Sequence, residues 1–487
     1  MALIFCLTSA ASGINLEKKI IRKKLKNGMT VLMVERRLSP TVSLYIRHRI
    51  GSLDEAEGES GTAHLLEHMM FKGTTTIGAK NYQEEKKILA EIEEAGEALD
   101  REKSKGDTAD QDAIERLEVR LKKLQDQQKR YFIPNEIDRL YTENGGLDMN
   151  ASTGQDITTY KVSLPSNKIE LWARIESDRL QSPVFREFYT ERQVVMEERR
   201  QRVESDPDGK FYEQFMKTAY TRHPYGRPIL GWPEDLMRLT PEKVRRFFQK
   251  YKERTRTVIA VVGDIDPEKT LSLIEKYFGS LPARMKEKTI VPVEPIQKEE
   301  RRVKVFFDAS PMIMIGFHKP AAPFHHDYVF DVLETVLARG RTSRLFNLLV
   351  KELQVAEDVD AYNGVPAARQ PNLFIISAKP RYPHTNAELG KIILAEIEKI
   401  KTQPLADLEL IKAKNQLRMQ CLRSLGSNQE IASTISYYEV LLGDYRYIFD
   451  YLTVIETVSN ADIQGIAQLY LTKENRTVGV LTQQREP

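Results

Sequence analysis

The sequence predicts an α+β protein made of two homologous αβ domains, with an antiparallel helical hairpin inserted in the first. Two observations support this prediction. The same strand landmarks occur in each half of the chain, and a charged helical segment accounts for the greater length of the first half. With 487 residues, of which 41% are hydrophobic and 29% charged, the chain is long enough to build two cores.

The repeat is defined by two short landmarks. The dipeptide Ser-Pro at positions 39 and 310 precedes an apolar strand pattern in each half, and the tripeptide Arg-Thr-Val at 256 and 476 opens another strand. The landmarks are 217 residues apart in the first half and 166 in the second. We therefore expect one fold to occur twice, with 51 extra residues in the first copy.

The segment from Tyr82 to Phe132 has the length of this difference. It is highly charged, and its apolar residues follow helical spacing on both sides of a polar turn, Ser104 to Asp110. The spacing after the turn, three and four residues in alternation, is typical of a coiled-coil seam. These features predict a helical hairpin at 82–132. Its apolar residues are Ile88, Ile92, Ala95 and Leu99, then Ile114, Leu117, Leu121 and Leu124.

The sequence His64-Leu-Leu-Glu67-His68 lies in an otherwise apolar or small segment. On a helix, residues four apart share a face, so the two imidazoles could bind one metal ion, with Glu67 beside them. A single histidine on such a helix is usually a core residue. A buried helix with all its ionisable groups on one side needs a reason for them, and zinc with a bound water supplies one.

A third ligand is expected, because hydrolytic zinc sites usually have three protein ligands and an open position for water. On a helix around 188–200, Glu191 and Glu198 fall on the apolar stripe, whereas Glu197 points away from it and needs no function. The alternative for Glu198 is a buried ion pair with an arginine such as Arg202. The apolar residues of the stripe are Phe188, Val194 and Val195.

Together these motifs resemble the pitrilysin/insulinase family of zinc peptidases, near mitochondrial processing peptidase and its short bacterial homologues. The resemblance covers nearly the whole chain, although the interval between His68 and Glu198 is longer than the family usually has. The matching segments are His64-x-x-Glu67-His68, Phe71-Lys-Gly-Thr74, Asn150-Ala-Ser-Thr153, Glu191-Arg-x-Val-Val-x-x-Glu198 and His223-Pro-Tyr-Gly-Arg-Pro-Ile229.

The resemblance implies one Zn²⁺ per chain, held by His64, His68 and Glu198. It also implies that Glu67 is the general base and that Glu191 orients the site from outside the ligand set. The expected function is a zinc metalloendopeptidase acting on peptides or unfolded segments.

The resemblance further implies that the substrate is bound as an added β-strand, next to an edge strand that contains Asn150 and Ala151. Two alternatives stay open: a catalytically silent structural subunit, and a scaffold built around the hairpin with purely structural zinc.

The resemblance also bears on partners. Related peptidases supply an Arg and a Tyr seven residues apart, from a C-terminal half or a partner chain, to hold the substrate. In the second half of this chain no tyrosine has an arginine seven residues before it. We expect a heterodimer with a related zinc-free chain, with a homodimer as the alternative.

The expected domains are a leader or signal-peptide remnant at 1–16, a catalytic zinc domain at 17–280, a proline-rich linker at 281–300 and a non-catalytic domain at 301–487. Residues 334–351, where the repeat would place a second metal helix, contain no histidine pair. The short apolar leader favours export to the periplasm, with a cytoplasmic location as the alternative.

Composition excludes other classes of function. The two cysteines, Cys6 and Cys421, provide no disulfide framework, and the net charge of +3 gives no reason to expect nucleic acid. No segment is long and apolar enough to span a bilayer.

Overall fold

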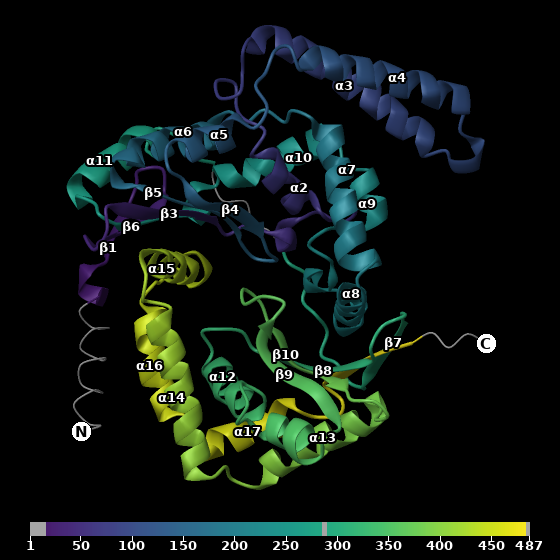
Figure 1. The fold of residues 1–487 in the computed structure, drawn as a ribbon, viewed down its shortest axis with the longest axis vertical. Helices are drawn as coiled ribbons and strands as arrows, with labels where there is room; N and C mark the ends of the chain where they lie inside the picture. The colour runs from purple at the N-terminus through teal and green to yellow at the C-terminus, as the bar shows by residue number, and fades with distance from the viewer. Residues whose placement is uncertain (1–15, 285–289, 484–487) are drawn as a thin grey trace.

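The computed structural model describes residues 16–284 and 290–483, which form two mixed β-sheets with helices on both faces (Figure 1). The first sheet has the order β1-β2-β6-β3-β5-β4 and the second the order β7-β11-β8-β10-β9. The strands of the first sheet are β1 (Ile21–Lys24), β2 (Thr30–Glu35), β3 (Thr41–His48), β4 (Leu147–Thr153), β5 (Thr158–Pro165) and β6 (Thr257–Gly263). Those of the second are β7 (Arg301–Phe306), β8 (Met312–Lys319), β9 (Ala356–Val365), β10 (Asn372–Pro380) and β11 (Arg476–Thr482).

The two sheets share one topology, which confirms the prediction of an α+β fold that occurs twice. In each sheet a parallel pair, β2 with β6 or β7 with β11, is followed by three antiparallel pairings in the same order. The strands expected from the sequence landmarks, β3 and β6 in the first half and β8 and β11 in the second, are central and adjacent in their sheets. Among the strands of the described residues, only β1 has no counterpart, and it lies at an edge.

The helices follow the same repeat. In order, β5 leads to α6, α7 and α8, and β10 leads to α13, α14 and α15. The helices of the first half are α2 (Thr62–Met69), α3 (Tyr82–Lys103), α4 (Gln111–Gln128), α5 (Glu136–Glu143), α6 (Ile169–Gln181), α7 (Phe188–Arg199), α8 (Pro207–Ala219), α9 (Pro233–Met237), α10 (Pro241–Phe248) and α11 (Pro267–Phe278). Those of the second are α12 (His325–Leu337), α13 (Asn386–Thr402), α14 (Asp407–Arg423), α15 (Asn428–Leu442), α16 (Tyr447–Thr457) and α17 (Asn460–Tyr470).

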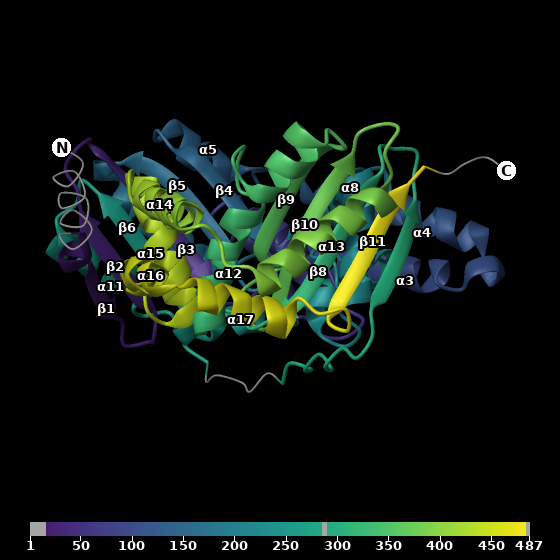
Figure 2. The ribbon, with the colours of Figure 1, turned by 90° about the horizontal axis from the view of Figure 1, so that it is seen from below.

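The halves exchange one helix each. Helix α15 of the second half packs on β3 and β6 of the first sheet, and α8 of the first half packs on β7 and β11 of the second. Both helices lie between the sheets in Figure 1. Helices of the same half cover the opposite face of each sheet, as Figure 2 shows for α13 on β8 and β10.

The predicted segment 82–132 contains two helices, α3 and α4, which pack against each other as an antiparallel hairpin and extend beyond the body of the molecule in Figure 1. Asn81 and Asp110 cap their N-termini through side-chain oxygens. Five of the eight predicted apolar residues are buried, and Ile88, Ile114 and Leu117 pack partly buried beside them. In the second half, α12 is followed within a few residues by a short π-helix (Phe346–Glu352), and no helix pair intervenes.

Two expectations need correction. Residues 334–351 are not one helix: they comprise the end of α12, a turn and most of the π-helix, so the counterpart of α2 by topology is α12. On α7, Val194 is 45% exposed and does not belong to the buried stripe with Phe188 and Val195, because α7 buries a narrower face than its periodicity suggests.

Three further features concern the termini, the linker and the membrane. The leader was expected at 1–16, and its residues 1–15 lie outside the described residues. Residues 285–289 of the expected linker lie outside them as well. The described part of the linker, 281–284 and 290–300, contains no helix or strand. Within the described ranges no helix has both the length and the apolar composition to cross a membrane.

The packing of α8 on β11 predicts that a glycine of β11 cannot be replaced without loss of stability. A Cβ atom at Gly479 on β11 would lie 2.8 Å from the rings of both Phe211 and Phe215 on α8. Gly479→Ala should therefore lower the free energy of unfolding by about 1–3 kcal/mol, as overpacked cores do, measured by urea denaturation. The matched control is Gly465→Ala in α17, where a Cβ meets nothing within 4 Å. Its expected effect is a gain of roughly 0.5–1 kcal/mol, from helix propensity. Equal effects at the two positions would contradict this packing.

Candidate metal centre

Helix α2 presents the predicted histidines from a buried position. It begins after Gly61, whose φ of 89° lies in the left-handed region that glycine adopts readily. The first-turn N–H of Ala63 donates to the buried carboxylate of Glu55 at 2.8 Å. Seven of its eight residues are buried, and His68 is the exception. The neighbouring elements therefore hold the imidazoles in place.

The side chains of His64, His68 and Glu198 come together as predicted. The Nε2 atoms of His64 and His68 lie 3.7 and 3.5 Å from Oε2 of Glu198, and potential ligand atoms of the three residues all lie within 4.8 Å of one another. Two atoms at zinc–ligand distances in a tetrahedral site are about 3.4 Å apart. Among the described residues this is the only such group of three or more, so these three residues fit a zinc ion.

Glu191 lies behind His68, as expected for a residue that orients a ligand. Its Oε2 is 3.3 Å from Nδ1 of His68, which leaves Nε2 for the metal. Its Oε1 is paired with Lys72, which also lies 3.3 Å from Glu187. The sequence reasoning missed Lys72, although it lies in the Phe-Lys-Gly-Thr segment that was singled out.

Glu198 combines the two interpretations of its position. Its Oε2 faces the histidines. Its Oε1 forms an ion pair with the guanidinium of Arg202, whose nearest nitrogen is 3.0 Å away. Arg202 is mostly exposed and belongs to the π-helix (Arg200–Glu204) that continues α7. The anticipated ion pair therefore exists without removing Glu198 from the metal group. Glu197 is exposed and pairs with Arg200, as expected for a solvated face.

Glu67 lies beside the ligand group and is held by the edge strand. Its Oε2 accepts a 2.6 Å hydrogen bond from the hydroxyl of Thr153, the last residue of β4. Burial raises the pKa of Glu67, and the Thr153 bond partly opposes that shift. Thr153 was quoted in a sequence motif but was given no role. Its position next to Glu67 depends on the pairing of β4 with β5, which short-range patterns do not reveal.

The two histidines differ in their electrostatic surroundings. Burial, with the nearby charge of His68 second, lowers the pKa of His64 to about 3, so His64 is neutral at pH 7. Burial also opposes protonation of His68, but the bond to Glu191 and the charges of Glu191, Glu67 and Glu198 outweigh it and raise the pKa of His68. The surroundings of His68 therefore favour its cationic form more than those of His64 do.

Asn150 and Ala151 lie on β4, the edge strand of the first sheet, and β4 contacts α2. Asn150 is exposed and Ala151 is partly buried. The N–H of Ala151 donates to the side-chain Oδ1 of its neighbour Asn150 at 2.9 Å. The predicted edge strand therefore exists beside the metal group.

Comparison with known proteins identifies the family of the chain. The family model described as insulinase (peptidase family M16) matches residues 30–109 and 129–232, and the model described as the peptidase M16 inactive domain matches residues 238–417. The chain therefore belongs to the insulinase family of peptidases, family M16. The unmatched stretch between the two parts of the first model falls on α4.

Individual relatives are named zinc proteases. The chain is 26% identical over 462 residues to the zinc protease PqqE of Helicobacter pylori, covering 93% of this chain and 90% of that one. It is 27% identical over 448 residues to an uncharacterized zinc protease of Rickettsia felis, covering 91% and 93%.

Solved structures show the same fold. A protease from Helicobacter pylori matches with a TM-score of 0.78 and 24% identity, over 95% of this chain and 99% of that one. The periplasmic protease PqqL from Escherichia coli matches with a TM-score of 0.71 and 18% identity, over 95% of this chain but 47% of that one.

The three glutamates of α7 should differ in their effect on zinc. Glu198→Gln should weaken zinc binding most, since it alters a ligand, and Glu191→Gln should weaken it by about 10- to 100-fold through loss of His68 orientation. Glu197→Gln is the matched control on the same helix and should leave zinc affinity unchanged. Chelator competition would measure all three. A larger effect at Glu197 than at Glu198 would show that the assignment is wrong.

Proposed function

We propose that the chain is a zinc metalloendopeptidase in which His64, His68 and Glu198 hold one Zn²⁺ and Glu67 is the general base. The observation that carries this proposal is the spare carboxylate. Glu67 lies beside a group of three ligand residues, in the part of the chain that the structure describes, and is not one of them. A structural zinc site would have a fourth protein ligand in place of such a carboxylate.

Zinc, when bound, would supply a Lewis acid that polarises the scissile carbonyl and makes water acidic. The chain provides the proton transfers. Thr153 fixes Oε2 of Glu67, which leaves Oε1 to take a proton from the attacking water and to pass it to the leaving amine. Glu191 and Lys72 hold the imidazole of His68 in its ligand orientation.

The edge strand β4 supports the added-strand mode of substrate binding. The N–H of Ala151 is bonded to the adjacent side chain of Asn150, so a carbonyl of an extended peptide can take the place of that amide oxygen. Thr153 lies two residues further along the same strand. A peptide paired with β4 would then lie next to Glu67. Because main-chain pairing tolerates many side chains, unfolded segments are the preferred substrate class.

Two rival functions remain distinguishable. A catalytically silent subunit would not hydrolyse peptides even with zinc bound. In a scaffold built around α3 and α4, zinc would only stabilise the fold. The intact group of His64, His68 and Glu198 with Glu67 beside it favours the enzyme over both. Hydrolysis of a quenched peptide by the zinc-loaded chain would decide.

The remaining expectations stand as part of this proposal. The catalytic domain would comprise 17–280, with α3 and α4 as an insertion, and the non-catalytic domain 301–487, joined by 281–300. We retain 1–16 as a leader and the periplasm as the compartment, with the cytoplasm as the alternative. The periplasmic location of one structural relative supports that choice.

The general base gives the sharpest test of chemistry. Glu67→Gln should keep zinc near the wild-type content but lower kcat by roughly 10²- to 10⁴-fold, the usual effect of losing a positioned acid–base group. Glu57→Gln, at an exposed position ten residues earlier, is the matched control and should leave kcat unchanged. Metal analysis and peptide hydrolysis would be measured on the same samples. Full activity in the Glu67 variant would exclude this mechanism.

The missing Arg–Tyr pair supports a partner subunit, a related chain without zinc ligands, with a homodimer as the alternative. The purified chain alone should then hydrolyse peptides more slowly than the same chain with its co-expressed homologue. Light scattering would report the stoichiometry of each sample. Equal turnover with and without the homologue would refute the requirement for a partner.

A further inference from the structure

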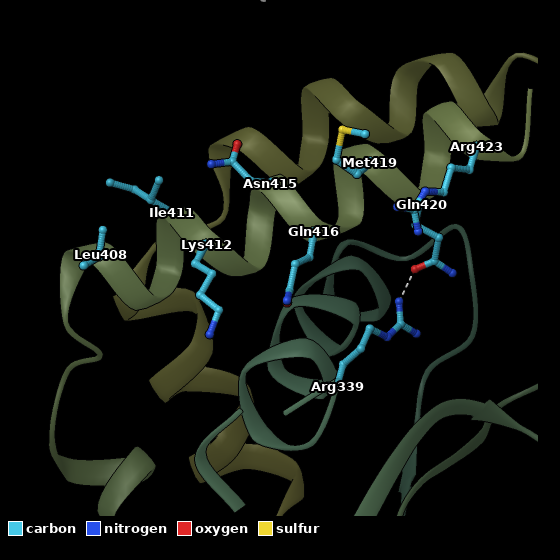
Figure 3. A pocket seen from close by; sticks show the side chains of 10 residues that line it. Arg339, Leu408, Ile411, Lys412, Asn415, Gln416, Met419, Gln420 and Arg423 are labelled. Carbon is cyan, nitrogen blue, oxygen red and sulfur yellow. Dashed lines mark hydrogen bonds between the residues drawn. The ribbon is translucent and has the colours of Figure 1, made fainter. Parts of the chain in front are cut away.

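A cavity of about 410 Å³ lies in the second half at the place that corresponds to the metal centre in the repeat. Residues of α12, β9 and α14, the counterparts of α2, β4 and α7, contribute to its lining, together with α15 and α16. Arg47 on β3 is its one lining residue from the first half among the described residues. A larger groove of about 780 Å³ on the outer side of α14 (Figure 3) shares Arg339 and Gln420 with it but is otherwise open and mostly exposed.

Arg47 is a buried cation without an anionic partner. The residue is 8% exposed, no carboxylate of the described chain forms an ion pair with it, and its Nε has no hydrogen-bond partner. Its guanidinium lies 5.6 and 5.5 Å from the ring centres of Tyr45 and Tyr437, and one N–H donates to Ser433 at 2.8 Å. The side chain is thus held in place while part of its donor capacity is unused.

Asp331 on α12 is the complementary group. Its oxygens accept from Tyr451 and from the amide of Asn363, at 2.9 and 2.8 Å, but no cation of the described residues pairs with it. The two cations nearby are already engaged, Lys319 with Asp327 and Arg339 with Glu334. Burial, followed by the charge of Asp327, raises the pKa of Asp331 to about 7. The other amide atom, Oδ1 of Asn363, is a buried acceptor without a partner.

A wall of tyrosine rings connects these two groups. Starting from Tyr437, which lies over Arg47, successive ring centres are 5.3, 4.7 and 6.2 Å apart through Tyr438 and Tyr447 to Tyr451, which bonds Asp331. The cavity therefore has a cation without an ion-pair partner at one end and aromatic faces along its wall. At the other end are a carboxylate without a cationic partner, Asp331, and an amide oxygen without a hydrogen bond, Oδ1 of Asn363. Three ring-to-ring steps exceed the span of one amino acid.

We propose that this cavity is a second ligand site that binds a short free peptide, with the terminal carboxylate on Arg47 and the terminal ammonium on Asp331. The carboxylate fits the guanidinium because arginine forms paired hydrogen bonds with it. The ammonium supplies donors to Asp331 and to Oδ1 of Asn363, and the tyrosine rings favour a cation near their faces. The proposal does not depend on peptidase activity at the metal centre.

Titration calorimetry on the full chain measures the affinity of the cavity for short peptides. A chelator removes zinc beforehand, so that the peptides are neither hydrolysed nor bound through the metal. The probes are trialanine, N-acetyl-trialanine, trialanine amide and free leucine. Trialanine should bind, and each capped peptide should bind roughly 10- to 100-fold more weakly, as expected for the loss of a charged hydrogen-bonded contact. Free leucine as the only binder, or equal binding of capped and free peptides, would overturn the proposal.

Variants separate the two ends. Arg47→Met should weaken trialanine binding by roughly 10- to 100-fold but leave the amide unaffected, and Asp331→Asn should do the same with the N-acetyl peptide as the unaffected probe. Arg341→Met, an exposed position outside the lining, is the matched control.

The melting temperature of the ligand-free protein distinguishes a ligand-binding role of Arg47 from a purely structural one. If Arg47 binds a ligand, Arg47→Met removes an unpaired buried charge and should not lower that melting temperature. A lower melting temperature with unchanged peptide affinity would mean that Arg47 serves the fold alone. If Arg47→Met does not fold, the capped peptides with the wild-type chain decide the question.

Discussion

The exchange of α8 and α15 between the halves is the interaction on which the rest of the structure depends. The central strands β3, β6, β8 and β10 are buried on both faces, so each sheet needs a helical layer on each side. One layer comes from the same half. The other comes from the opposite half, where Ile431, Ile435 and Leu441 of α15 cover the first sheet, and Phe211 and Phe215 of α8 cover the second. Neither sheet can bury its inner face alone.

This exchange also positions the metal centre. The π-helix that continues α7 is followed after two residues by α8 and packs against it, so the helix that carries Glu198 is fixed at its far end to the second sheet. A polar contact reinforces the arrangement: Arg369, in the loop between β9 and β10, pairs with buried Asp54 at 2.8 Å. The N–H groups of Ala368 and Arg369 donate to Asp156 in the matching loop between β4 and β5. The second half thus holds in place the segment before α2 and the loop after β4, and it contributes no residue to the metal group.

Sequence reasoning predicted what is encoded locally or by repetition. The spacing of His64 and His68 placed two ligands on one face, and the α-helical phase of Glu191, Glu197 and Glu198 separated an inward pair from an outward residue. The repeat followed from landmarks that occupy equivalent central strands. Sequence reasoning failed where tertiary packing decides the burial of a residue. Val194 satisfies the helical period of α7, yet its side of the helix is left uncovered and the residue is exposed.

The residues that sequence reasoning missed are those whose partners come from distant strands or helices. Thr153 meets Glu67 only because β4 pairs at the sheet edge beside α2. Lys72 meets Glu191 only because α7 crosses the end of α2. Arg47 has an ordinary position in an alternating strand, and its lack of a carboxylate partner becomes visible only once α15 covers it.

The two halves show how one topology supports two kinds of polar site. At the position where α2 offers two imidazoles and a carboxylate, α12 offers Asp327, Asp331 and Glu334, and the nearby β9, the counterpart of β4, offers Asn363. Imidazoles favour a transition metal. In the second half, Asp327 and Glu334 are already paired with Lys319 and Arg339, which leaves Asp331 for the charged ligand proposed above. The backbone repeat fixes where a polar cavity can exist, and the side chains on one helix of each half decide what it binds.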